Sequence, residues 1–66
     1  MAGAYVHIRN GLADIQTGLE DGIWRGLKKL PASEAKTRLE YRARLAYEAY
    51  ERLGSLIDEL ESQGKI

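Results

Sequence analysis

The sequence contains no cysteine, so neither a disulfide nor a thiolate metal site can stabilise the fold. It also contains only one histidine. His7 cannot build an imidazole metal site alone. Net charge is also absent, because ten basic and ten acidic residues cancel, which disfavours bulk capture of nucleic acid or anionic membrane. No apolar run approaches the ~18 residues of a spanning helix, and Met1 to Arg9 lacks the basic-then-apolar order of a signal peptide. We therefore expect a cytoplasmic protein with no metal, no cofactor and no membrane insertion.

Groups suited to catalysis are scarce as well. The chain offers no combination of Cys, His and Ser that resembles a nucleophile with its base, and no glycine-rich loop that could hold a phosphate. Its carboxylates each have an arginine nearby and a solvated position that accounts for them. We expect that the protein is not an enzyme.

The length of 66 residues sets the next constraint. It allows a single domain, residues 1–66, and a chain this short seldom buries enough apolar surface to fold alone. Small folds compensate with disulfides, metals or oligomerisation. With the first two excluded, association with a second copy or a partner is the expectation.

Pro31 is the only proline and divides the chain nearly in half. Apolar residues on each side recur at steps of three and four, the spacing of one helix face, and after the proline the steps alternate as in a coiled coil. We expect a helix over about residues 4–30, a turn over 31–33 and a second helix over 34–63. The predicted core seam comprises Ile8, Leu12, Ile15, Leu19, Ile23, Leu27, Leu39, Ala43, Ala46, Tyr50, Leu53, Ile57 and Leu60.

The short connection predicts the arrangement of the two helices. Pro31 disfavours helical backbone at Leu30, and Ser33 is a good N-cap for the second helix. So short a turn forces long helices to lie antiparallel. The expected fold is an all-α antiparallel two-helix hairpin that dimerises into a four-helix bundle.

The first residues allow an alternative. Tyr5 to Arg9 alternates with a period of two, and Asn10-Gly11 is a turn signal. A short N-terminal strand followed by two helices resembles the ribbon-helix-helix class of dimeric DNA-binding proteins. That resemblance implies that Tyr5, His7 and Arg9 would face a DNA groove.

Four glycines interrupt the first predicted helix, although each costs about 1 kcal/mol relative to alanine. They share one edge of the helix beside the apolar stripe, and three of them are four residues apart, as in small-residue ridges that let two helices approach closely. They are Gly11, Gly18, Gly22 and Gly26. We expect a close helix–helix contact here, within the hairpin or between copies; the alternative is a loose or interrupted first helix.

Charge is distributed unevenly along the chain. Residues 25–44 carry seven bases and two acids, a net +5, whereas residues 1–24 sum to −2 and residues 45–66 to −3. The turn end of the hairpin is therefore basic, and two hairpins would prefer to pair head to tail. Trp24 lies off the apolar stripe, where an interface or partial burial near the turn would explain it. The candidate partner contacts are Trp24, Arg25, Lys28, Lys29, Arg38 and Arg42.

Two further resemblances concern layout and short motifs. In size and layout the chain resembles the Rop-type RNA-binding hairpins that dimerise into four-helix bundles. Trp24-Arg25-Gly26 resembles the Trp-x-Gly turn of ESX-type secreted hairpins, and Tyr47 with Glu51 resembles their Tyr-x-x-x-acid export motif. Those secreted proteins are usually about half as long again.

The expected function is that of a small regulatory or adaptor protein that homodimerises and binds another protein, such as a phage- or plasmid-type modulator of a host factor. The alternative is a nucleic-acid-binding regulator of the Rop or ribbon-helix-helix kind. A small secretion-system hairpin or co-chaperone is the third class.

Overall fold

A computed structural model describes residues 2–66 of the chain. Its elements are α1 (Ala2–Thr17), the π-helical segment η1 (Gly18–Ile23), α2 (Trp24–Lys29) and α3 (Glu34–Ser62). Helices and the loops beside them account for all of residues 2–66, without a strand, which confirms the all-α class. The alternative of an N-terminal strand is wrong, because Tyr5 to Arg9 lies within α1, where Tyr5 and Ile8 continue the helical stripe of Leu12.

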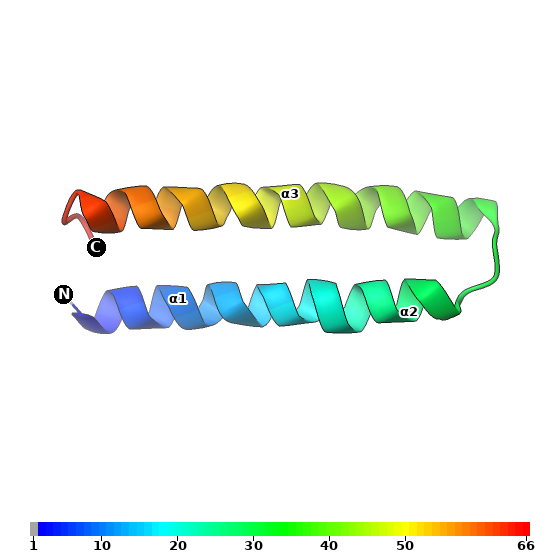
Figure 1. The fold of residues 1–66 in the computed structure, drawn as a ribbon, viewed down its shortest axis with the longest axis horizontal. Helices are drawn as coiled ribbons and strands as arrows, with labels where there is room; N and C mark the ends of the chain where they lie inside the picture. Colours follow the sequence, from blue (N-terminus) through cyan, green and yellow to red (C-terminus); the bar gives the residue numbers. More distant parts are fainter. Residues whose placement is uncertain (1) are drawn as a thin grey trace.

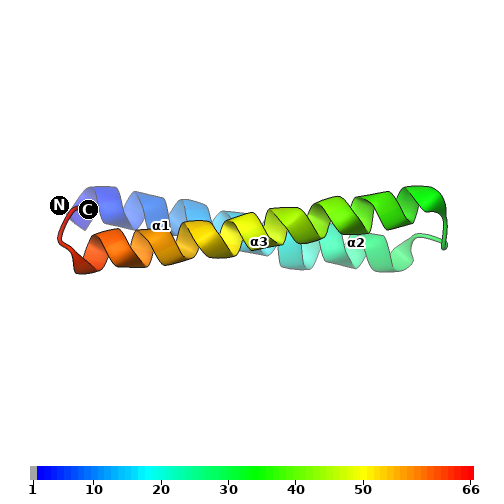
Figure 2. The same ribbon diagram turned by 90° about the horizontal axis from the view of Figure 1, so that it is seen from above.

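The elements form two arms that lie side by side (Figures 1 and 2). α1, η1 and α2 follow one another without a break and form the first arm, and α3 is the second. The arms run in opposite directions, so the two chain ends meet at one end of the molecule and the turn lies at the other (Figure 1). The whole measures 47 × 16 × 10 Å, the dimensions of two helices placed next to each other.

The turn has the backbone that its residues dictate. Leu30, which precedes the proline, is extended at φ −81° and ψ 142° and ends α2. The Ser33 hydroxyl accepts a hydrogen bond from the Lys36 amide at 3.1 Å and caps α3. At the far end of α3, Gly64 adopts a positive φ of 72° just after the C-cap residue Gln63, a conformation that favours glycine.

The π-helical segment compensates for one extra residue in the apolar stripe. Leu12 and Leu19 are seven residues apart, close to two helical turns, and both are buried. Leu27 follows eight residues later, which in a regular α-helix would rotate it by about 80° away from α3. Because a π-helical turn takes up the additional residue, Leu27 returns to the side of α3 and is only 5 % exposed. The first arm therefore departs from α-helical geometry in η1 but continues as one uninterrupted helix.

The core between the arms is small. Its buried residues are Leu12, Leu19, Leu27, Ala43 and Ile57. Two other members of the predicted seam, Tyr50 and Leu60, are half-buried. The remaining members, which are exposed in the single chain, are Ile8, Ile15, Ile23, Leu39, Ala46 and Leu53. Two helices touch along a single line, so about one residue in seven on each arm reaches it, and the rest of the wide apolar stripe stays outside.

The role of η1 can be tested by deleting one residue. Deletion of the exposed Asp21 shortens the step from Leu19 to Leu27 from eight positions to seven. The first arm then becomes regular α-helix with Leu12, Leu19 and Leu27 still facing α3. We expect equal or greater helicity by circular dichroism and no loss of thermal stability. Deletion of the exposed Ala13 is the control, because it rotates the preceding turns by about 100° and should lower the melting temperature. Equal damage from both deletions would contradict this account.

Candidate association surface and basic tip

A broad apolar surface covers one side of both arms. Helical spacing places the exposed isoleucines and glycines of the first arm along one flank of the line that faces α3, and the exposed leucines and alanines of α3 along the matching flank. We call this surface the apolar face. Its residues are Ile8, Gly11, Ile15, Gly18, Gly22, Ile23, Gly26, Leu30, Leu39, Ala46, Ala49, Leu53 and Leu56.

An apolar groove shows that the two flanks lie on the same side of the molecule. It has a volume of about 330 Å³ and lies on the apolar face close to the turn. Its lining residues are Gly22, Ile23, Gly26, Leu27, Leu30 and Leu39, which come from both arms. The two glycines supply no side chain, so they leave the groove open.

The glycines of the first arm do not make the close contact between the arms that their spacing allowed. A Cβ atom placed on Gly11, Gly18, Gly22 or Gly26 would find no neighbour within 4 Å among the residues that the structure describes. The reason is their position on the flank, away from α3. The close approach occurs instead at Gly54 of α3, where a Cβ would lie 3.5 Å from Leu12 Cδ2. Sequence reasoning missed Gly54, which stands alone in its helix; a contact of the four glycines between copies stays a prediction.

The opposite flank is polar. There Arg9 forms an ion pair with Asp58, linking α1 to α3. Nearer the middle, the Tyr47 hydroxyl donates a hydrogen bond of 2.8 Å to Glu20 Oε1. Each interaction joins a half-buried residue to an exposed one in the other arm, so solvent screens it and its contribution to stability is small. The single chain is therefore two-sided, with polar links on one side and unpartnered apolar side chains on the other, where helical spacing also places the exposed Arg42 among them.

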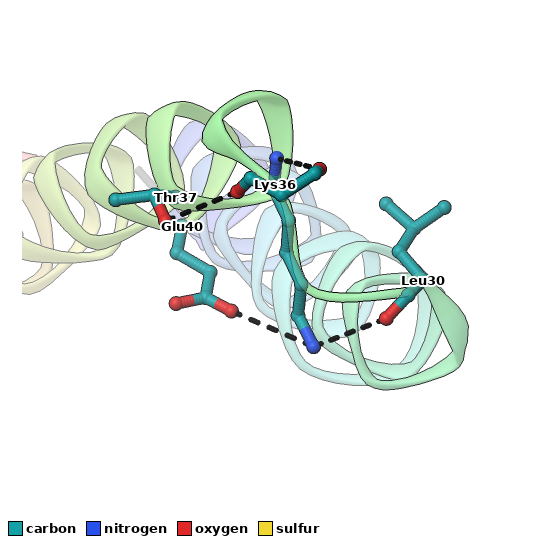
Figure 3. A network of polar contacts seen from close by, with 5 residues as sticks. Leu30, Lys36, Thr37 and Glu40 are labelled. Atoms are coloured by element: carbon teal, nitrogen blue, oxygen red, sulfur yellow. Dashed lines mark hydrogen bonds and ion pairs between the residues drawn. The ribbon is translucent and has the colours of Figure 1, made fainter.

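A polar network closes the turn end (Figure 3). The Lys36 ammonium donates to the Leu30 carbonyl at 3.2 Å and lies 3.9 Å from Glu40 Oε1. The Thr37 hydroxyl donates to the Ser33 carbonyl at 3.2 Å. Lys36 thus satisfies a carbonyl left without a helical partner at the end of α2. Lys36 therefore has a structural role in the turn.

The other candidate contact residues occupy different surroundings. Arg25, Lys28 and Lys29 are exposed on the last turns of the first arm, and we call these three residues the basic tip. Arg38 lies 3.7 Å from Glu34 within α3, and Arg42 Cζ lies 5.9 Å from the centre of the Tyr41 ring.

Trp24 begins α2 and is half-buried. The added residue in η1 rotates it relative to a regular helix, so its position could not be read from a helical wheel. Its indole therefore combines partial packing with an accessible surface next to the basic tip, the combination common at binding interfaces.

No family model, curated protein or solved structure matches this chain. Within residues 2–66 no group of three or more His, Asp or Glu side chains could hold a metal ion, and no helix there is both long and apolar enough to cross a membrane.

The link between Tyr47 and Glu20 has a measurable titration. The hydrogen bond to Glu20, together with the negative charge of that carboxylate, raises the pKa of Tyr47 above its usual value of about 10. The protonated phenol of Tyr47 is the donor in this hydrogen bond. The hydrogen bond is therefore fully formed below pH values near the usual tyrosine pKa, and it is lost as the pH rises through the raised pKa that Tyr47 has in the folded chain. We expect Glu20→Gln to lower the pKa of Tyr47, followed by NMR of its ring.

Glu48→Gln serves as the control for this titration, because Glu48 is exposed on the same helix and is not among the groups that raise the pKa of Tyr47. An unchanged pKa in Glu20→Gln would show that the two arms are not linked there.

Proposed function

We propose that this chain is a small non-enzymatic regulatory or adaptor protein that forms an antiparallel hairpin, homodimerises into a four-helix bundle and binds another protein. The observation that carries the proposal is the apolar face. It extends along both arms and exposes six large side chains at 42 % or more: Ile15, Ile23, Leu30, Leu39, Leu53 and Leu56. An exposed apolar surface of this extent on a water-soluble chain calls for a partner.

The size of the face supports a second copy as that partner. The broad side of the molecule measures 47 × 16 Å, or about 750 Å² per copy in projection. Two such faces together bury an area within the range of specific protein interfaces, roughly 1,200–2,000 Å². The core of five buried residues in the single chain is small for a stable fold. Pairing supplies the missing burial.

The turn end is the part of the dimer that remains available for another protein. The basic tip is exposed, lies beside the half-buried Trp24 and belongs to the stretch with a net charge of +5. Arginine and tryptophan are enriched among residues that dominate protein interfaces. We infer that the chain recognises an acidic surface of its partner through the tip.

Nucleic acid is the second candidate ligand, because the same three exposed bases suit a phosphate backbone. The sum of charge over the chain is zero, so nucleic-acid binding would be confined to the tip. The two candidates differ in their response to salt, which is steep for phosphate contacts.

Homodimerisation predicts a concentration-dependent stability. The melting temperature should rise with protein concentration, because association stabilises the folded state by mass action, and sedimentation should give twice the mass of the chain. Leu53→Glu places a charge in the middle of the apolar face and should shift the sedimentation to the monomer. Glu48→Gln, on the polar side of α3, is the matched control. A wild-type monomer whose melting temperature does not vary with concentration would refute the proposed dimer.

Partner binding predicts a separate effect of Trp24. In affinity capture from the native host, Trp24→Ala should lose the bound partner while helicity by circular dichroism stays unchanged. The control is Val6→Ala, which truncates an apolar side chain that is 51 % exposed elsewhere on the surface. Loss of helicity in Trp24→Ala would make the residue structural. If nuclease treatment destroys the captured material, the bound partner is nucleic acid and the proposed protein partner is refuted.

A further inference from the structure

We propose that two copies pair head to tail through their apolar faces, about a twofold axis at the level of Thr17 and of the Ala49–Tyr50 bond, so that Ile8 of each copy enters the groove between Gly22 and Gly26 of the other. This inference rests on the proposed homodimer and specifies its geometry. Four observations support it: the pattern of the first arm, the pattern of α3, the level at which the two arms face each other, and the distribution of charge.

The stripe of the first arm fits against a second copy of the same arm that runs in the opposite direction. When two identical helices pack antiparallel, residues at equal distances on either side of the crossing point meet. Taking Thr17 as that point, large residues of the stripe fall opposite small ones in three pairs. The pairs are Ala4 with Leu30, Ile8 with Gly26, and Gly11 with Ile23. Such alternation lets side chains of one copy fill the space that glycine or alanine leaves in the other.

On α3, apolar residues also meet apolar residues about the centre of the helix, and one pair joins a large residue to a small one. About the midpoint between Ala49 and Tyr50, Ala46 falls opposite Leu53 and Leu39 falls opposite Leu60. Leucine and alanine thus meet in the first pair, and two leucines meet in the second. This pattern involves a different helix and different residues from those of the first arm.

Contacts between the arms show that the two centres lie at one level. The Leu12 side chain approaches Gly54, and Glu20 is hydrogen-bonded to Tyr47. Interpolating between these contacts places Thr17 beside Ala49 and Tyr50. A rigid molecule has one twofold axis with its partner, so both arms must reverse about the same level. Both arms meet this condition, although the two patterns come from different residues.

Charge selects the head-to-tail direction over its alternative. Two copies could also stack with their turns together, which would superimpose two stretches of net +5. The head-to-tail pair keeps these stretches at opposite ends and sets each beside residues of the other copy that belong to the segments with net −2 and −3. Like charges brought together at an interface oppose association, and opposite charges favour it.

In the proposed pair, a side chain of the second copy occupies the apolar groove near the turn. It opens on the apolar face where Gly22 and Gly26 lack side chains. In the proposed pair, Ile8 of the second copy lies at the level of Gly26, and Leu60 of the second copy lies at the level of Leu39. Ile8 is 38 % exposed in the single chain, so its side chain is available for this contact.

A spin-label distance measures the direction of pairing. The native chain has no cysteine, so Ala32→Cys gives one label in the exposed turn. Head-to-tail dimers should give a distance between labels close to the 47 Å length of the molecule, by pulsed electron paramagnetic resonance. A dimer with labels closer than ~20 Å, about two interhelical spacings, would overturn this inference and leave the proposed function intact. A monomer by sedimentation would overturn both.

A size swap tests the contact itself. Gly26→Ile should raise the dimer Kd by a factor on the order of ten or more, because the added side chain occupies the groove. A Cβ at Gly26 meets no atom within 4 Å in the described part of the chain, so helicity should not fall. Adding Ile8→Ala to Gly26→Ile should recover most of the lost affinity, and Gly3→Ile, outside the face, should leave the Kd unchanged. A wild-type Kd in Gly26→Ile, or no recovery in the double variant, would overturn the contact.

Discussion

Two helical rods that lie side by side share a single line of contact, and the rest of the structure follows from that limit. Along this line Leu12, Leu19 and Leu27 of the first arm reach α3, while most of the apolar stripe does not. A chain without cysteine has no disulfide to offset the small core. The apolar side chains left outside form the surface on which we propose that a second copy packs.

The π-helical segment is a consequence of keeping that line continuous. Leu27 follows Leu19 by eight positions, one more than two regular turns accommodate. The chain absorbs the extra residue between Gly18 and Ile23, a segment that begins with glycine and contains another at Gly22. Glycine lowers the cost of departing from α-helical geometry because it carries no side chain to clash. Both glycines lie on the apolar face, and Gly22 also lines the groove near the turn.

The separation of polar and apolar links gives the molecule two distinct sides. Arg9 with Asp58, and Tyr47 with Glu20, join the arms along one flank. The other flank carries isoleucine, leucine and glycine with no polar link between the arms recorded among the described residues. A second copy that covers this flank would leave both turns exposed, with Trp24 and the basic tip at the two ends of the assembly. A binding protein built in this way would present two identical contact sites separated by the length of the bundle.

The sequence by itself determined the helices and where the connection between them lies. Periodic apolar residues predicted two helical segments, Pro31 placed the connection, and Ser33 marked the start of α3, because these depend on local spacing, backbone restriction and capping. Only the tertiary structure decided which apolar residues face the other arm. The stripe is wider than one line of contact, so its pattern alone could not separate Ala43, which is buried, from Leu39, which is exposed. The position of Trp24 and the close approach at Gly54 likewise depended on how one extra residue was absorbed and how two helices met, and neither is a property of a local segment.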